Sequence, residues 1–145
     1  MINQDLLAWA RSYIGVAELE GDLNNATIME MARILGVTHY TQDVSDWCGL
    51  FLAFLAHVTG AEKPSSFLIA RNWLAVGAPV IRPIEGDLCV LWRNAPDSGF
   101  GHVGLYVGED ATNVFLLGGN QVGKVREFNY AKERVLGYRR LWRAS

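Results

Sequence analysis

The sequence lacks the features that mark several large classes of protein. No apolar run approaches the roughly 20 residues that a membrane span requires. Residues 1–5 hold no basic stretch ahead of an apolar core, so we expect synthesis in the cytoplasm without a Sec-type signal. The 13 Lys and Arg residues are scattered among 15 Asp and Glu, for a net charge of -2. We therefore expect neither a membrane nor a nucleic acid as a partner.

Cysteine and the usual metal-binding patterns are also scarce. The chain has two cysteines, Cys48 and Cys89, and three histidines, with no Cys-x-x-Cys or His-x-x-x-His spacing. This pattern contains no set of residues with zinc-ligand spacing, and we expect no metal and no other cofactor. A disulfide is rare in a chain without a secretory signal, although a Cys48–Cys89 bridge is the alternative to two separate thiols.

The composition of the chain fits one domain. Half of its 145 residues are hydrophobic, which is enough to bury a core without disulfides or metals. No repeat, low-complexity stretch or linker divides it, so we expect a single domain over residues 1–145 and a monomer.

Helical and β-type patterns occupy different halves of the chain. Apolar residues recur at helical spacing over 5–14, over a second segment capped by Asn24 or Asn25, over 48–58 and over 66–74. From Pro79 onward, short β-rich runs alternate with turns, and the candidate strands are 80–82, 87–93, 102–107, 113–117, 124–128 and 134–142. This order predicts an α+β fold with helices packed on an antiparallel sheet of about five or six strands.

The run from Ser45 to Val58 joins a polar start to a long apolar stretch. It predicts a buried helix that begins near Cys48, with Ser45 or Asp46 as its cap. The partial positive charge of a helix N-terminus favours thiolate over thiol, which makes Cys48 a candidate nucleophile. The alternative is an ordinary buried thiol, which is what we expect for Cys89 in its strand-like run.

A candidate partner for this thiol lies in the second half of the chain. His102 begins a predicted strand, between glycines that leave space around its imidazole. A histidine there can accept the thiol proton and return it to a leaving amine. Its alternative role is a structural hydrogen bond at a strand end. His39 lies in a polar loop, and the helix dipole alone explains His57 near a helix C-terminus.

A cysteine–histidine pair needs a third group that orients the imidazole. Asn120, which follows the strand 113–117 in a meander, is the first candidate, and the adjacent Gln121 is the alternative. Residues 118–121 also have the composition of a plain hairpin turn. The candidate substrate contacts are Tyr40, Trp47, Phe100 and Gln121.

In their order and spacing, these motifs resemble a known family. The motifs are Trp47-Cys48-Gly49, Gly86-Asp87, Gly101-His102-Val103-Gly104 and Gly118-Gly119-Asn120-Gln121. They are similar to those of the papain-like bacterial cell-wall cysteine peptidases of the NlpC and CHAP superfamily. Segments 10–18, 70–74 and 135–140 resemble a small single-domain branch met in phage lysis genes and near bacterial secretion clusters. The resemblance spans nearly the whole chain.

The resemblance implies a papain-like fold and hydrolysis of an amide bond in the peptide part of peptidoglycan, through a thioester on Cys48. His102 would act as base and acid, Asn120 as the orienting group, and the Cys48 backbone N–H as part of an oxyanion hole. Many CHAP members carry a carboxylate just before the asparagine, where this chain has Gly118-Gly119. Delivery to the wall would need a holin or a secretion apparatus, and an immunity protein is a further candidate partner.

A second hypothesis assigns the same fold to a protein without catalytic activity. In it, the chain is a wall-binding or structural domain of a phage tail or secretion apparatus. The missing carboxylate favours this reading. So do the aromatic side chains of Tyr40, Trp47, Trp92 and Phe100, which can grip sugars or peptide stems.

Overall fold

The structure is a computed structural model that describes residues 2–18, 25–37 and 47–144. Helices come first along these ranges: α1 (Asn3–Ser12), α2 (Ala26–Ile34), α3 (Trp47–Thr59) and the 3-10 helix η1 (Ala70–Ala75). The strands follow as β1 (Ala78–Val80), β2 (Leu88–Trp92), β3 (Gly101–Glu109), β4 (Asn113–Gln121), β5 (Lys124–Ala131) and β6 (Val135–Arg140). A short 3-10 turn, η2 (Lys132–Arg134), separates β5 from β6.

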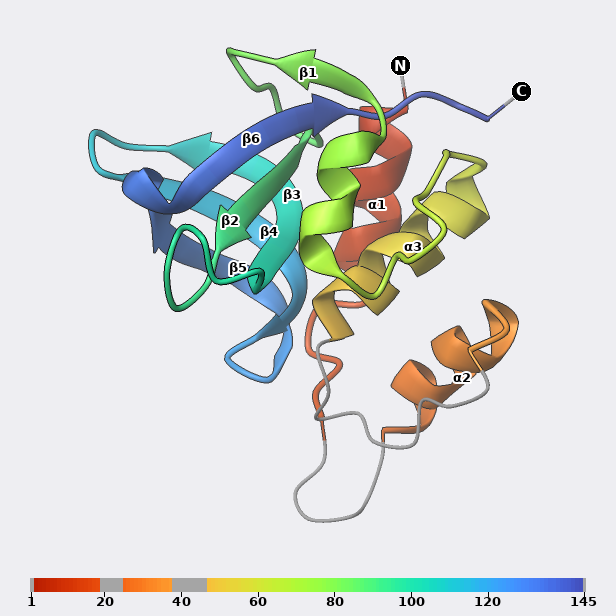
Figure 1. Ribbon diagram of the computed structural model, residues 1–145. Helices are drawn as coiled ribbons and strands as arrows, with labels where there is room; N and C mark the ends of the chain where they lie inside the picture. The colour runs from red at the N-terminus through yellow and green to blue at the C-terminus, as the bar shows by residue number, and fades with distance from the viewer. Residues whose placement is uncertain (1, 19–24, 38–46, 145) are drawn as a thin grey trace.

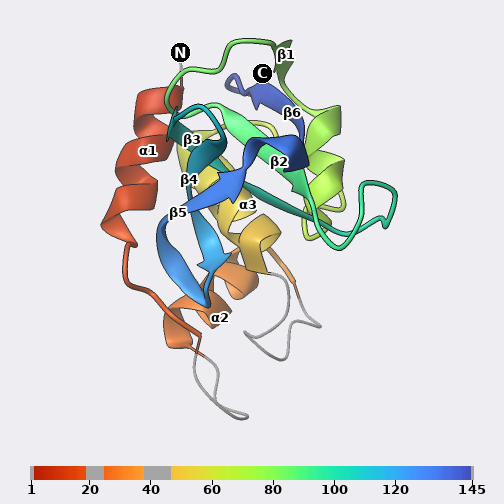
Figure 2. The ribbon, with the colours of Figure 1, turned by 90° about the vertical axis from the view of Figure 1, so that its left-hand side faces the viewer.

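The strands of the described residues form one six-stranded sheet in the order β1-β6-β2-β3-β4-β5. Every neighbouring pair in this sheet is antiparallel. Helices α1 and α3 and the turn η1 pack on one side of the sheet, and α2 packs on α3 (Figures 1 and 2). The predicted α+β fold, with N-terminal helices on a C-terminal antiparallel sheet, is confirmed.

Local sequence explains where the helices begin and how they are buried. Asn25 caps α2 as predicted, because its side-chain oxygen accepts hydrogen bonds from the backbone N–H groups of Thr27 and Ile28 at 2.8 and 3.2 Å. Helix α3 is apolar on nearly every side and is buried between the other helices and the sheet. Its expected caps, Ser45 and Asp46, lie outside the described residues.

A second, smaller apolar cluster covers the other face of the sheet. It contains Cys89, Leu91, Tyr106, Val114 and Leu116, with Tyr130, Val135 and Tyr138 packed against it. Burial raises the pKa of the Cys89 thiol to about 12, so the predicted core role of this cysteine is confirmed. Cys48 and Cys89 are both buried and no disulfide joins them.

Strands β3, β4 and β5 run further than the sequence pattern indicates, most of all β4, whereas β2 and β6 are shorter than predicted. Residues 118–121, for which a hairpin turn was the alternative to a functional role, belong to β4. The turn that joins β4 to β5 is Val122-Gly123, and both of its residues have positive φ, at 53° and 75°. Two central residues with positive φ are what a tight antiparallel hairpin needs. The predicted helix over 66–74 is replaced by the shorter η1.

The Gly86-Asp87 motif is a structural anchor. Asp87 is fully buried and accepts two hydrogen bonds from Arg140, both at 2.8 Å, and one from the side chain of Asn3 at 2.9 Å. A buried carboxylate is tolerated when it is paired in this way. Asp87, just before β2, thus ties α1 to β6. In the described ranges, no helix is both long and apolar enough to cross a membrane.

Candidate functional site

The structure places Cys48 and His102 in the same region. Cys48 is the second residue of α3 and is 1% exposed, while His102 is the second residue of β3 and is 4% exposed. Tyr130 of β5 links them. Its hydroxyl oxygen lies 3.3 Å from His102 Nε2. Burial raises the pKa of the Tyr130 hydroxyl, and the charge of the nearby Cys48 thiolate raises that pKa further.

A glycine lets the last part of β4 approach the first turns of α3. A Cβ added to Gly119 would lie 2.8 Å from atoms of both Trp47 and Phe51. No larger residue fits at this position without moving the helix or the strand. The close approach brings the end of β4, with Gln121, beside the helix start that carries Cys48.

The group that holds His102 is Gln121. The Oε1 atom of Gln121 lies 2.9 Å from His102 Nε2, and the glutamine side chain is fully buried. The amide nitrogen of Gln121 donates to two backbone oxygens, those of Leu116 and Arg126. Both amide hydrogens are therefore used, and the amide has one orientation in which all of its polar atoms are satisfied.

This amide orientation determines the tautomer of the histidine. Since Oε1 of Gln121 can only accept, Nε2 of His102 must carry the hydrogen that is donated to it. In the neutral imidazole, Nδ1 is then the nitrogen with the free electron pair. A base for a nearby thiol needs such a nitrogen, while its other nitrogen is held by a third group.

A β-bulge explains why Gln121, and not Asn120, reaches the histidine. Gly118 pairs with Arg126, but Gln121 pairs with Lys124, so β4 has one residue more than β5 in this interval. In a regular strand Asn120 would share the face of Gly118. The extra residue, with Asn120 at a φ of 57°, reverses the alternation and turns Gln121 to that face. The first choice of Asn120 as orienting group is corrected to its alternative, Gln121.

Two further glycines make room for the glutamine. A Cβ on Gly118 would lie 2.8 Å from Gln121 Oε1, and one on Gly104 would lie 3.2 Å from the same atom. The Gln121 amide thus lies over Gly104 of β3 and Gly118 of β4, in space that is open because neither residue has a side chain. This gives Gly104 and Gly118 a physical role in the site: a larger residue at either position would displace the hydrogen bond to His102.

The predicted substrate contacts have different outcomes. Trp47 is fully buried, with its indole N–H 3.4 Å from the Glu18 carboxylate, so it is a core residue and not a surface contact. Gln121 is buried against His102 and is likewise not a surface contact. Phe100 is 54% exposed, as a substrate contact requires. Tyr40, like His39, lies outside the described residues.

An open hollow of about 260 Å³ lies at the start of β3. It is lined by Leu68, Ile69, Ala70, Gly99, Phe100 and Gly101. Gly101 immediately precedes His102 in β3, and Ile69 and Phe100 are the exposed apolar side chains of the lining.

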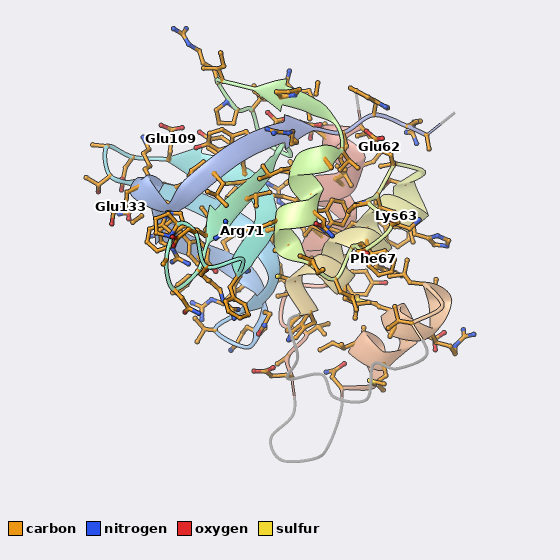
Figure 3. The ribbon with its side chains drawn as sticks, in the orientation of Figure 1. Glu62, Lys63, Phe67, Arg71, Glu109 and Glu133 are labelled. Carbon is orange, nitrogen blue, oxygen red and sulfur yellow. The ribbon has the colours of Figure 1, made fainter. Side chains whose placement is uncertain are left out.

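Arg71 of η1, labelled in Figure 3, binds the loop that leads into β3. Its guanidinium donates to the backbone oxygens of Phe100 and Pro96 at 2.9 Å each, and to that of Ala95 at 3.3 Å. The three hydrogen bonds fix the loop that leads into β3 and His102. Sequence reasoning missed this role, because the carbonyls that Arg71 binds are 24 to 29 residues away along the chain.

Tyr130 was also missed. Its ring lies 5.1 Å from the His102 ring at an interplanar angle of 35°. Phe128 and Tyr130, two residues apart on β5, lie on the same face of the sheet, but no local pattern shows which residues of other strands they contact. In the described part of the chain, no three His, Cys, Asp or Glu side chains gather as a metal site requires.

Comparison with known proteins adds no family to this geometry. No model of a protein family matches the chain, and no curated protein matches it in sequence.

Proposed function

We propose that the chain is a cysteine amidohydrolase that cleaves an amide bond in the peptide part of peptidoglycan. The observation that carries the proposal is the buried hydrogen bond from His102 Nε2 to Gln121 Oε1, which leaves Nδ1 of the imidazole as the proton acceptor. The arrangement also matches the motif order that resembles cell-wall cysteine peptidases.

The proposed reaction proceeds through two steps on Cys48. His102 Nδ1 accepts the thiol proton, and the thiolate attacks the amide carbonyl carbon. The backbone N–H of Cys48 is one donor to the developing oxyanion. When the C–N bond breaks, the imidazolium gives its proton to the leaving amine, and a thioester remains. Water, deprotonated by His102, then hydrolyses the thioester and restores the thiol.

The substrate class follows from the family resemblance, and the hollow at the start of β3 supports it. Its exposed apolar residues Ile69 and Phe100 suit small aliphatic side chains such as the alanines of a wall peptide. An endopeptidase and an N-acetylmuramoyl-L-alanine amidase both fit this proposal. The protein would act in the periplasm after delivery by a holin or a secretion apparatus, and a secreted form would be accompanied by an immunity protein.

Digestion of purified peptidoglycan tests the proposal. We expect each bond that the native protein cleaves to give one new amino group and one new carboxyl group, and mass spectrometry of the released fragments identifies the bond. Cys48→Ala should release none, while Cys89→Ala, the matched control, should release the same fragments as the native protein. Hydrolysis that survives Cys48→Ala would overturn the thiol mechanism. So would loss of activity with a chelator and its recovery with zinc.

The burial of the two reacting groups favours a second candidate function. At 1% and 4% exposure, Cys48 and His102 present almost no surface to a ligand. A wall-binding domain that does not catalyse hydrolysis would be compatible with the burial of Cys48 and His102. In the same digestion experiment, such a domain would sediment with the peptidoglycan and release no fragment, and Phe100→Ala would reduce the sedimented fraction.

A further inference from the structure

We propose that Tyr130 is a second positioning residue for His102, whose Nε2 hydrogen is shared between Gln121 Oε1 and the Tyr130 hydroxyl oxygen. The catalytic consequence of this contact rests on the proposed function, but its effect on the histidine does not. Both oxygens approach the same ring nitrogen, Gln121 Oε1 at 2.9 Å and Tyr130 Oη at 3.3 Å. Because Oε1 of Gln121 can only accept, the hydrogen belongs to Nε2 of His102, and the tyrosine oxygen is its second acceptor.

The tyrosine ring also bounds the imidazole. The two ring centroids are 5.1 Å apart and the planes are inclined by 35°, so the contact is a tilted stack. A residue in this place limits rotation of the imidazole about its Cβ–Cγ bond. Gln121 fixes one edge of the ring by a hydrogen bond, and Tyr130 fixes a face of it by contact.

Tyr130 is itself held by groups that do not involve His102. The edge of one aromatic ring meets the face of the other between Phe128 and Tyr130, at 5.4 Å and 72°. The Arg134 guanidinium lies 5.3 Å from the Tyr130 ring centroid and donates to the backbone oxygen of Trp92 at 3.0 Å. The position of the tyrosine is therefore set by β5 and its neighbours before His102 changes charge.

The chemistry of the hydroxyl suits this role. Burial raises the pKa of Tyr130, so the side chain stays a neutral phenol across the pH range in which a thiol–imidazole pair works. When His102 takes the Cys48 proton, the Nε2–H of the imidazolium is donated to two neutral oxygens. The site thus stabilises the imidazolium with two dipoles, where a carboxylate would supply a charge.

The first test observes the histidine directly. Nitrogen-15 NMR of the imidazole groups reports the tautomer of His102 and the chemical shift of its Nε2–H proton. In Tyr130→Phe, which keeps the ring and removes the oxygen, we expect the same tautomer and a changed Nε2–H shift. Tyr138→Phe removes a hydroxyl from the same face of the sheet, in contact with Tyr106, and should leave the His102 signals unchanged.

The second test observes the thiol. At mildly acidic pH, we expect Tyr130→Phe to slow alkylation of Cys48 by iodoacetamide about 2- to 10-fold, as loss of one hydrogen bond to the imidazolium predicts. Turnover on peptidoglycan should fall by a similar factor with KM unchanged, because the interaction strengthens only when the imidazole is charged. Tyr138→Phe should match the native protein in both measurements.

The outcomes separate this inference from the proposed function. If Tyr130→Phe matches the native protein in the His102 signals and in the alkylation rate, Tyr130 is not a positioning residue, whether or not the wall is cleaved. If both measurements change as expected in a protein that cleaves no peptidoglycan, the inference stands and the proposed function fails.

Discussion

The two cysteines are both buried, yet their surroundings differ in every other respect. Cys48 lies in the first turn of α3, close to Tyr130 and in the region of His102. Cys89 lies in the middle of β2 among apolar side chains, with Tyr106 and Tyr138 as its aromatic neighbours, and burial alone raises the pKa of its thiol to about 12. Burial therefore does not distinguish a candidate nucleophile from a core residue. The difference is a helix N-terminus and an oriented imidazole.

The reactivity of the two thiols should differ most. At mildly acidic pH, we expect iodoacetamide to modify Cys48 at least about 1000-fold faster than Cys89, because the reacting species is the thiolate. Peptide mapping by mass spectrometry after limited exposure measures both rates in one sample. Faster labelling of Cys89, or equally slow labelling of the two thiols, would mean that Cys48 is an ordinary buried thiol.

Removal of the base should have the next largest effect. His102→Ala should lower turnover on peptidoglycan by about 100- to 10,000-fold, the range typical of a general base. His57→Ala is the control, since His57 is exposed in the last turn of α3 and should be dispensable. Native turnover in His102→Ala would assign proton transfer to another group.

The orienting group gives a smaller and more specific effect. Gln121→Ala should lower turnover about 10- to 100-fold with little change in KM, because orientation of the base matters most in the transition state. Asn120→Gly is the matched control: glycine accepts the φ of 57° at this position without strain, so the bulge should persist and activity should remain. The reverse result would return the role to Asn120.

Much of the fold could be predicted from the sequence, because the signals that specify it are local. The cap at Asn25, the apolar helix behind Cys48 and the order of helices and strands each follow from a short window of residues. Cys89 was also assigned to the core correctly, from the pattern of its own strand.

The parts of the site that could not be predicted depend on register and on distant contacts. A single extra residue in β4 exchanges Asn120 for Gln121 at the histidine, and the sequence carries no mark of it beyond glycines that also suit a turn. Trp47 was expected at the surface, but its ring is enclosed where Gly119 lets the strand approach the helix. Neither outcome is a property of one segment alone.

Cys89→Ser should affect stability and not turnover. The site is fully buried in the second cluster, and a hydroxyl left unpaired there costs about 1 to 3 kcal/mol of the free energy of unfolding. Urea denaturation of the two proteins measures this difference, and digestion of peptidoglycan should proceed at the native rate. An inactive Cys89→Ser protein with native stability would mean that the roles of the two cysteines are exchanged.

The stability of the protein should depend on pH through Cys89. Burial raises the pKa of Cys89 in the folded protein from its ordinary 9.0 to about 12. Above pH 9, the unfolded chain loses the thiol proton while the folded chain keeps it, so the folded state is progressively disfavoured as the pH rises toward 12. The slope attributable to this thiol is about 1.4 kcal/mol per pH unit. Cys89→Ala has no thiol to titrate, so it should be less stable than the native protein at pH 8 because of the cavity, and this deficit should shrink steadily between pH 9 and pH 11. Urea denaturation of both proteins across this range tests it. The Cys89 charge also raises the pKa of Tyr106 and Tyr138, so the titration of these two tyrosines is part of the difference, while that of the other tyrosines cancels. A deficit that stays constant with pH would show that the Cys89 thiol ionises as readily in the folded protein as in the unfolded chain.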